Sequence, residues 1–142
     1  MPRDLGDVRV SGRRPALATA TVRRVVHSVL RAERRDAAVS ITFLGASTMR
    51  RLNDEFLGHD QPTDVISFGL AGPDRRLAGD VYICRAVAAR NARRHGVPLR
   101  QELVRLVIHG TLHVLGYEHP DGDHRTRSPM WQRQERYVKR FG

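Results

Sequence analysis

The sequence predicts a single α+β domain in which a small mixed β-sheet of about four strands packs with about five helices. Its 142 residues can bury one sizeable core but are too few for two domains of ordinary size. Segments with apolar residues at helical spacing alternate with short segments rich in β-branched residues, and no repeat, linker or low-complexity stretch separates them. We therefore expect residues 1–142 to form one domain.

The hydrophobic pattern of the first half predicts two strands and two helices. A short edge strand is expected at 7–11, and the alternating, β-branched segment 39–44 is expected to form a second strand. Between them, residues 15–35 are predicted to form a helix that has a proline in its first turn and arginines opposite its apolar stripe. A further helix is expected to follow Ser47 and to end at Gly58. The apolar stripe of the first helix consists of Val22, Val25, Val26, Val29 and Leu30.

The middle of the chain predicts a β-hairpin. A polar loop at 59–64 leads into a strand at 65–68, and a second strand is expected at 80–84. Glycine, proline and aspartate at 72–74 indicate the turn between them. We expect the two strands to pair with each other.

Three helices are expected to complete the chain. The first covers 85–95 and is ended by Gly96, and the second covers 98–115 and is ended by Gly116. The last begins near Ser128, a suitable N-cap that is followed by a proline in the first turn.

The charge of the chain is strongly positive and is carried almost wholly by arginine. There are 24 arginines, one lysine and 15 acidic residues, which gives a formal net charge of +10. This excess favours a polyanionic partner, with nucleic acid first. Codon bias, with each arginine on a solvated face, is the alternative that charge alone leaves open. The pairs Arg50-Arg51 and Arg93-Arg94 could line a cleft or lie on solvated helix faces.

The composition also predicts the compartment. Residues 1–10 contain no apolar segment like that of a secretory signal, and no stretch approaches the roughly 18 apolar residues of a membrane span. Cys84 is the single cysteine, which excludes an internal disulfide and fits a reducing environment. We therefore expect a cytoplasmic protein.

The segment 108–119, IHGTLHVLGYEH, contains three histidines at metal-ligand spacing. His109 and His113 are four residues apart, so their rings lie on the same face of a helix. Gly116 ends that helix and allows the chain to turn back and bring His119 beside them. Three imidazoles leave a fourth position open for water, as in catalytic zinc sites. We predict one Zn²⁺ per chain, although three imidazoles also suit nickel and other divalent ions.

The alternative for these side chains is a set of histidines packed in the core without a metal. The helix around His109 is apolar on nearly all sides and is expected to be central and buried. Burying two unpartnered rings costs about 1–3 kcal/mol each, which a shared metal ion avoids. The other histidines are expected to be surface or capping residues: His27, His59, His95 and His124.

The histidine spacing equals that of the H-E-x-x-H-x-x-G-x-x-H zinc proteases, with one exception. Gly110 stands where those enzymes have the glutamate that acts as general base. Glycine cannot accept a proton, and it more readily permits close approach by another backbone element or by a substrate. Glu118, beside the third histidine, is a weak candidate for a catalytic carboxylate, with an exposed loop residue as the alternative. The general base is therefore unassigned.

Several segments together resemble one family. HGTLHVLGYEH resembles the H-G-x-L-H-L-x-G-Y-D-H signature of the YbeY endoribonucleases, bacterial factors of ribosomal RNA maturation. Leu52-Asn53 with 62–68 is similar to the family's L-N … P-T-[DN]-V-[LI]-S-F block, and 79–83 is similar to its G-D-I-x-I strand. The resemblance spans 39–135 in the right order. Further similar positions are Glu102-Leu103, Met130 and Glu135.

The resemblance implies an activity and a set of partners. It implies that His109, His113 and His119 bind a zinc ion and that the protein cleaves single-stranded RNA. It further implies a role in maturation of the 3′ end of small-subunit ribosomal RNA and in ribosome quality control. The implied partners are ribosomal RNA and the small ribosomal subunit.

Two positions depart from the family pattern. Glu118 replaces the usual aspartate, which lengthens the carboxylate by one methylene. Leu57 stands where many relatives have an arginine implicated in catalysis or RNA contact, and leucine cannot bind phosphate. His59 is a candidate substitute for that arginine, with a surface histidine as the alternative.

The sequence is compatible with three functional hypotheses. The leading hypothesis is a metal-dependent endoribonuclease, in which zinc lowers the pKa of its bound water toward about 7 and arginines stabilise charge on the phosphate. The second is a zinc-dependent, peptidase-like hydrolase, which Gly110 disfavours. The third is a non-enzymatic ribosome or rRNA-binding factor with a structural zinc, for which His124 or Asp121 would supply a fourth ligand.

Overall fold

A computed structural model describes residues 6–12, 16–71, 76–119 and 126–142 of the chain. It confirms the predicted α+β class, with a four-stranded mixed sheet and five helices. In chain order the elements are β1 (Asp7–Ser11), α1 (Thr19–Glu33), β2 (Ala37–Leu44), α2 (Ala46–Leu57), β3 (Val65–Ala71), β4 (Leu77–Cys84), α3 (Arg85–His95), α4 (Leu99–Val114) and α5 (Pro129–Phe141).

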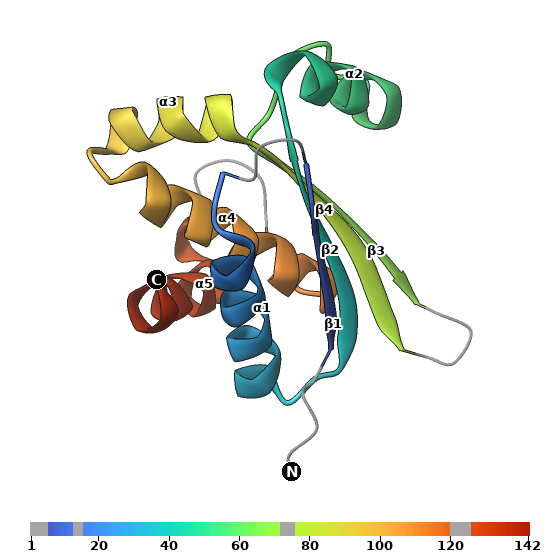
Figure 1. Cartoon of the computed structure of the whole chain (residues 1–142), viewed down its shortest axis with the longest axis vertical. Helices are drawn as coiled ribbons and strands as arrows, with labels where there is room; N and C mark the ends of the chain where they lie inside the picture. The colour runs from blue at the N-terminus through green and yellow to red at the C-terminus, as the bar shows by residue number, and fades with distance from the viewer. Residues whose placement is uncertain (1–5, 13–15, 72–75, 120–125) are drawn as a thin grey trace.

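The sheet has the strand order β1-β2-β4-β3. Strands β1, β2 and β4 are parallel, with Val8 opposite Val39 and Ile41 opposite Val81. Strand β3 is antiparallel to β4, with Ser67 opposite Val81, and it forms one edge of the sheet (Figure 1). The hairpin that the sequence predicts is thus confirmed.

Alternation along the strands gives the sheet two different faces. In β2 every second residue is buried, beginning at Ala37 and ending at Phe43, and this face lies under α1 and α4. Figure 1 shows α1, α4 and α5 on one side of the sheet and α2 at one end of it. A second, smaller apolar cluster joins α2 to the opposite face: Met49, Ile66, Cys84 and Val87.

Helix α4 is central, as its apolar sequence predicts. It contacts α1, α3, α5, β2, β3 and β4, and its core positions include Leu103, Val107 and Leu112. Burial on all sides explains why this helix lacks a polar face. None of the helices in the described ranges is both long and apolar enough to cross a membrane.

Several boundaries differ from the predicted ones. Helix α1 begins at Thr19 rather than near Pro15, and Pro15 lies outside the described residues. Helix α1 ends at Glu33 because Arg34 adopts a left-handed conformation with φ of 55°. The hairpin strands β3 and β4 are longer than their hydrophobic runs, because antiparallel pairing extends to the ends of both strands. The predicted turn at 72–74 falls outside the described residues.

Candidate metal centre and its cleft

The three predicted ligands lie together at the C-terminal end of α4. The Nε2 atoms of His109 and His113 are 3.1 Å apart, and the two ring centroids are 4.6 Å apart. The ring of His119 lies 5.2 Å from that of His109 and 5.1 Å from that of His113. One nitrogen from each ring can be chosen so that all three lie within 4.8 Å of one another. The structure therefore brings together three histidines that span ten positions of the sequence, from His109 to His119.

The end of α4 explains how His119 returns to the helix. Gly116 has a φ of +100°, and its N–H donates to the carbonyl of His113 at 2.9 Å. The N–H of Tyr117 donates to the carbonyl of Leu112 at 3.0 Å. These two bonds form a Schellman motif, which requires a left-handed residue and favours glycine there. The chain consequently reverses within a few residues and delivers the third imidazole.

The donor set fits a transition-metal ion. Two imidazole nitrogens bound tetrahedrally to one ion at 2.0–2.1 Å would be about 3.3 Å apart. The 3.1 Å between the Nε2 atoms of His109 and His113 is close to that value. Neutral imidazole is a common ligand of zinc, nickel, copper and iron, so the residues select a class of metal and not one element.

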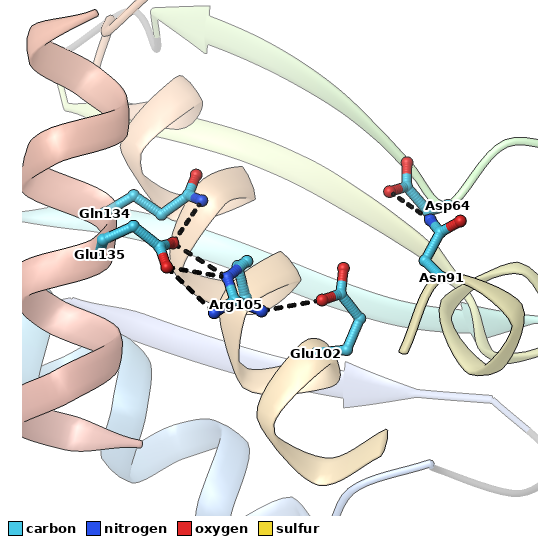
Figure 2. A network of polar contacts seen from close by, with 6 residues as sticks. All are labelled: Asp64, Asn91, Glu102, Arg105, Gln134 and Glu135. Atoms are coloured by element: carbon cyan, nitrogen blue, oxygen red, sulfur yellow. Dashed lines mark hydrogen bonds and ion pairs between the residues drawn. The ribbon is translucent and has the colours of Figure 1, made fainter. Parts of the chain in front are cut away.

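Gln134 fixes the tautomer of His109. Its Oε1 lies 2.6 Å from Nδ1 of His109. Its Nε2 donates to the carboxylate of Glu135 at 3.0 Å, as Figure 2 shows. Because the amide nitrogen is occupied by the carboxylate, the amide oxygen must accept, and Nδ1 of His109 must carry the proton. The lone pair of His109 is therefore on Nε2, the nitrogen that faces His113.

A partly buried ion-pair network supports Gln134. Arg105 donates to both carboxylate oxygens of Glu135 at 2.9–3.2 Å and to Glu102 at 2.9 Å (Figure 2). Burial alone would lower the pKa of Arg105, but the bonds to Glu135 and Glu102 more than offset this and raise its pKa. The chain of contacts thus runs from α4 across to α5 and holds the amide rigidly behind the histidine.

The segment that carries His119 is anchored through Tyr117. Its hydroxyl donates to Glu33 at 2.6 Å, and Glu33 also accepts from Arg133 at 2.7 Å and from the hydroxyl of Tyr137. Burial tends to raise the pKa of the Glu33 carboxyl, but the hydrogen bonds from the two tyrosines and Arg133 outweigh this and lower it. The cluster ties the last residue of α1 and the middle of α5 to Tyr117, two residues before the third ligand.

Gly110 allows α4 to lie directly on the sheet. A Cβ at this position would be 2.4 Å from Cγ1 of Val81 and 3.2 Å from Oγ of Ser67. The close approach expected of this glycine is therefore made by another element, strand β4. A glutamate here would have to displace the side chain of Val81, so the packing at this position disfavours the zinc-protease base.

The three histidines line a cleft of about 340 Å³. Its other walls come from the end of α2, the following loop and β3, and comprise Leu57, Thr63, Asp64, Val65, Ile66, Ser67 and Phe68. Asp64 and His109 also line an adjoining cleft of about 400 Å³, to which Arg94 and Arg105 contribute. Among the described lining residues of the histidine cleft there is no lysine or arginine.

The remaining sequence candidates lie elsewhere. Glu118 is exposed and lines a neighbouring cleft that shares Ser67 and His113 with the histidine cleft, so a catalytic role for it stays a prediction. His59 is exposed in the loop after α2 and is not among the lining residues of the histidine cleft. His124 and Asp121 fall outside the described residues. The arginines of both pairs are exposed, and one of them, Arg94, also lines the adjoining cleft that Asp64 and His109 share: Arg50, Arg51, Arg93 and Arg94.

Sequence reasoning missed Gln134 and Asp64 as parts of the site. Gln134 is 1% exposed and lies on the apolar stripe of α5, four residues after Met130 and four before Val138. A buried amide on an apolar stripe requires a partner, so this pattern was a usable signal. Asp64 belongs to the segment 62–68 that resembles a block of the YbeY family, but only the folded loop shows that it lines the cleft of the histidines.

Nearly the whole chain matches one known protein family. A sequence profile described as "Endoribonuclease YbeY" matches residues 4–142. The chain belongs to the YbeY endoribonuclease family. The family resemblance that the histidine segment indicates is thereby confirmed.

Individual YbeY relatives agree with this assignment. The chain is 37% identical over 129 residues to Endoribonuclease YbeY of Chlorobium luteolum, covering 90% of this chain and 92% of the relative. It is 32% identical over 118 residues to the protein of the same name from Thermotoga petrophila, covering 83% and 77%. The solution structure of TM1509 from Thermotoga maritima superposes with a TM-score of 0.68 at 29% identity, covering 94% of this chain and 88% of that one.

Proposed function

We propose that this YbeY-family protein is a metal-dependent endoribonuclease that cleaves single-stranded RNA. Its proposed role is ribosomal RNA processing in the cytoplasm, namely maturation of the 3′ end of small-subunit rRNA and ribosome quality control, with the small ribosomal subunit as partner. The observation that carries the proposal is the convergence of His109, His113 and His119 in one cleft of a chain that matches this family from residue 4 to residue 142.

His109, His113 and His119 would hold one Zn²⁺ ion per chain. When bound, such an ion lowers the pKa of a coordinated water and polarises a phosphate oxygen. The residues of the chain prepare the site for it: Gln134 keeps the proton of His109 on Nδ1, and the turn at Gly116 holds His119 in place. The described lining of the histidine cleft offers no lysine or arginine for the phosphate, and Arg94 and Arg105 line the adjoining cleft that shares Asp64 and His109.

Asp64 is a better candidate than Glu118 for the carboxylate that acts on the substrate. It lies in the histidine cleft, where its carboxylate accepts from the amide of Asn91 at 3.3 Å and from Thr63 at 3.4 Å. These bonds orient the carboxylate within the cleft. Glu118 does not line the histidine cleft itself but a neighbouring cleft that shares Ser67 and His113 with it.

The position of Gly110 supports a nuclease over a peptidase of the zinc-protease type. The space that a side chain would need at this position is occupied by Val81 and Ser67. The chain therefore lacks, at the expected place, the glutamate that takes a proton from water in those enzymes.

The test compares cleavage of single-stranded and double-stranded RNA by the purified protein. We expect the single strand to be cut, cleavage to stop in chelator, and added zinc to restore it. The variant His113→Ala should lose both bound zinc and cleavage, whereas His27→Ala, on helix α1 away from the cleft, should keep both. Cleavage that persists unchanged in chelator and in His113→Ala would contradict the proposal.

A further inference from the structure

The last turn of α2 carries an exposed apolar surface. Phe56 is 56% exposed and Leu57 is 52% exposed, and within the described residues these are the two large hydrophobic side chains that lie open to solvent. They are adjacent in sequence, whereas scattered single exposed residues are ordinary on a soluble protein. An exposed aromatic and an aliphatic side chain side by side indicate a contact surface.

This surface is held in a fixed position. Asn53, which is 4% exposed, donates from Nδ2 to the carbonyl of Gln61 at 2.8 Å and so ties α2 to the following loop. Gly58 ends the helix in a left-handed conformation with φ of 71°, and its N–H donates to the carbonyl of Asp54 at 3.0 Å. The two apolar side chains are therefore presented by an anchored helix end and not by a free loop.

The exposed surface is continuous with the histidine cleft. Leu57 and Phe68 both line that cleft together with His113 and His119. The ring of Phe56 packs edge-to-face on Phe68, with centroids 5.3 Å apart and an interplanar angle of 65°. One wall of the cleft is thus apolar and extends outward through Phe68 to Phe56. We refer to Phe56, Leu57 and Phe68 as the apolar wall.

We propose that the apolar wall binds an unpaired base of the RNA next to the phosphate that lies at the three histidines. This inference rests on the proposed function and names the part of the substrate that the wall contacts. Bases of single strands are free to leave the stack and pack on aromatic and aliphatic side chains, whereas bases of a duplex are not. A leucine at position 57 cannot bind phosphate, so the contact made here is with the base face and not with the backbone.

The charge of the chain favours a nucleic acid over an apolar protein segment as occupant. The net charge is +10, whereas α2 itself carries both signs, with Arg50 and Arg51 exposed along with Asp54 and Glu55. A chain of strong positive net charge suits a ligand with a charged backbone and flat apolar faces, and the apolar wall leads directly into the histidine cleft where that backbone is proposed to lie. A hydrophobic protein partner is the competing occupant, and the experiment below separates the two.

The experiment measures binding of a labelled single-stranded RNA and of a strand of equal length that has abasic ribose at every position. Both carry the same phosphates, so only the first can use a base contact. Affinities are measured at one salt concentration in chelator and, before turnover, with zinc. The variants are Phe56→Ala and Leu57→Ala, with Phe56→Trp as the conservative change. Phe141→Ala, an aromatic residue at the end of α5 outside the cleft, is the control.

We expect each alanine variant to weaken binding of the base-containing strand about ten-fold, the size expected for loss of one base contact. Binding of the abasic strand should change less than two-fold, and Phe56→Trp should bind as the wild type does. Because the side chains are more than half exposed, the variants should fold, which circular dichroism checks.

Equal losses on both strands, no loss on either, or no RNA binding by the wild type would each overturn this inference. The outcome is separable from that of the proposed function. If RNA cleavage requires the histidines but Phe56→Ala binds RNA as the wild type does, the proposed base contact is wrong and the proposed nuclease activity stands. If binding depends on the bases but no RNA is cleaved, the base contact stands and the proposed nuclease activity is wrong.

Discussion

The amide of Gln134 lies 2.6 Å from Nδ1 of His109 and thereby decides which nitrogen of that ring can bind a metal. Outer partners of this kind typically change metal affinity 10–100-fold when they are removed. We expect Gln134→Leu to weaken zinc binding by about that factor, as measured by competition with a chromophoric chelator. Gln132→Leu, an exposed residue on the same helix, should bind zinc normally. Unchanged affinity in Gln134→Leu would show that the amide does not act on the ligand.

Glu33 should contribute to the pH dependence of stability. Its pKa is lowered in the folded protein, so its contribution is fully present above the unfolded pKa of about 4.3 and is lost as the pH falls through the lower folded value. We expect Glu33→Gln to be less stable than the wild type at pH 7, and the difference in free energy of unfolding to shrink below about pH 4.3. Urea denaturation of both proteins from pH 3 to pH 7 measures this, and a difference independent of pH would contradict it.

Gly110 should tolerate no side chain while Val81 stays in place. A Cβ at 110 would lie 2.4 Å from Val81, so Gly110→Ala should lower the free energy of unfolding by about 1–3 kcal/mol. Trimming the obstacle in the double variant Gly110→Ala, Val81→Ala should make the two costs less than additive. Gly69→Ala, whose Cβ would meet only ordinary contacts at 3.8 Å, serves as the control. Additive costs in thermal denaturation would show that the clash is relieved elsewhere.

The two candidate carboxylates can be separated by activity. Asp64 lines the cleft of the histidines and Glu118 lines a neighbouring one. If the carboxylate of Asp64 moves a proton during cleavage, Asp64→Asn should lower the rate about 10²-fold or more at unchanged zinc content. Glu118→Gln should have little effect. The reverse result would return the role to Glu118, and rates are to be compared under single-turnover conditions.

Much of the fold could be predicted from local pattern. The alternation of β2, the stripe of α1 and the glycine that ends α4 each depend on neighbours within a few residues, and the structure agrees with them. The ends of the strands do not follow from local pattern, because pairing with a neighbouring strand sets where each strand ends. The hairpin strands extend beyond their apolar runs since each supplies hydrogen bonds to the other.

The site, like the fold, has a part that local sequence predicts and a part that depends on tertiary packing. The spacing of His109, His113 and His119 determined by itself that three imidazoles could meet, because a helix and one glycine turn suffice to bring them together. Gln134 and Asp64 come from other elements, and no local pattern gives their distance from the histidines. The packing of α4 against α5 places Gln134 beside His109, and the packing of the loop after α2 places Asp64 in the cleft.

Sequence alone therefore determined the class of the domain, the three candidate ligands and the family. Only the tertiary structure decided that Gly110 serves the contact with Val81, that Leu57 stands in the wall of the cleft, and that the arginine-rich surface leaves the described lining of the histidine cleft without a cation. The physical reason is that charge and helical spacing are properties of a segment. The walls of a cleft are instead made by residues far apart in the chain, and their identity follows from packing.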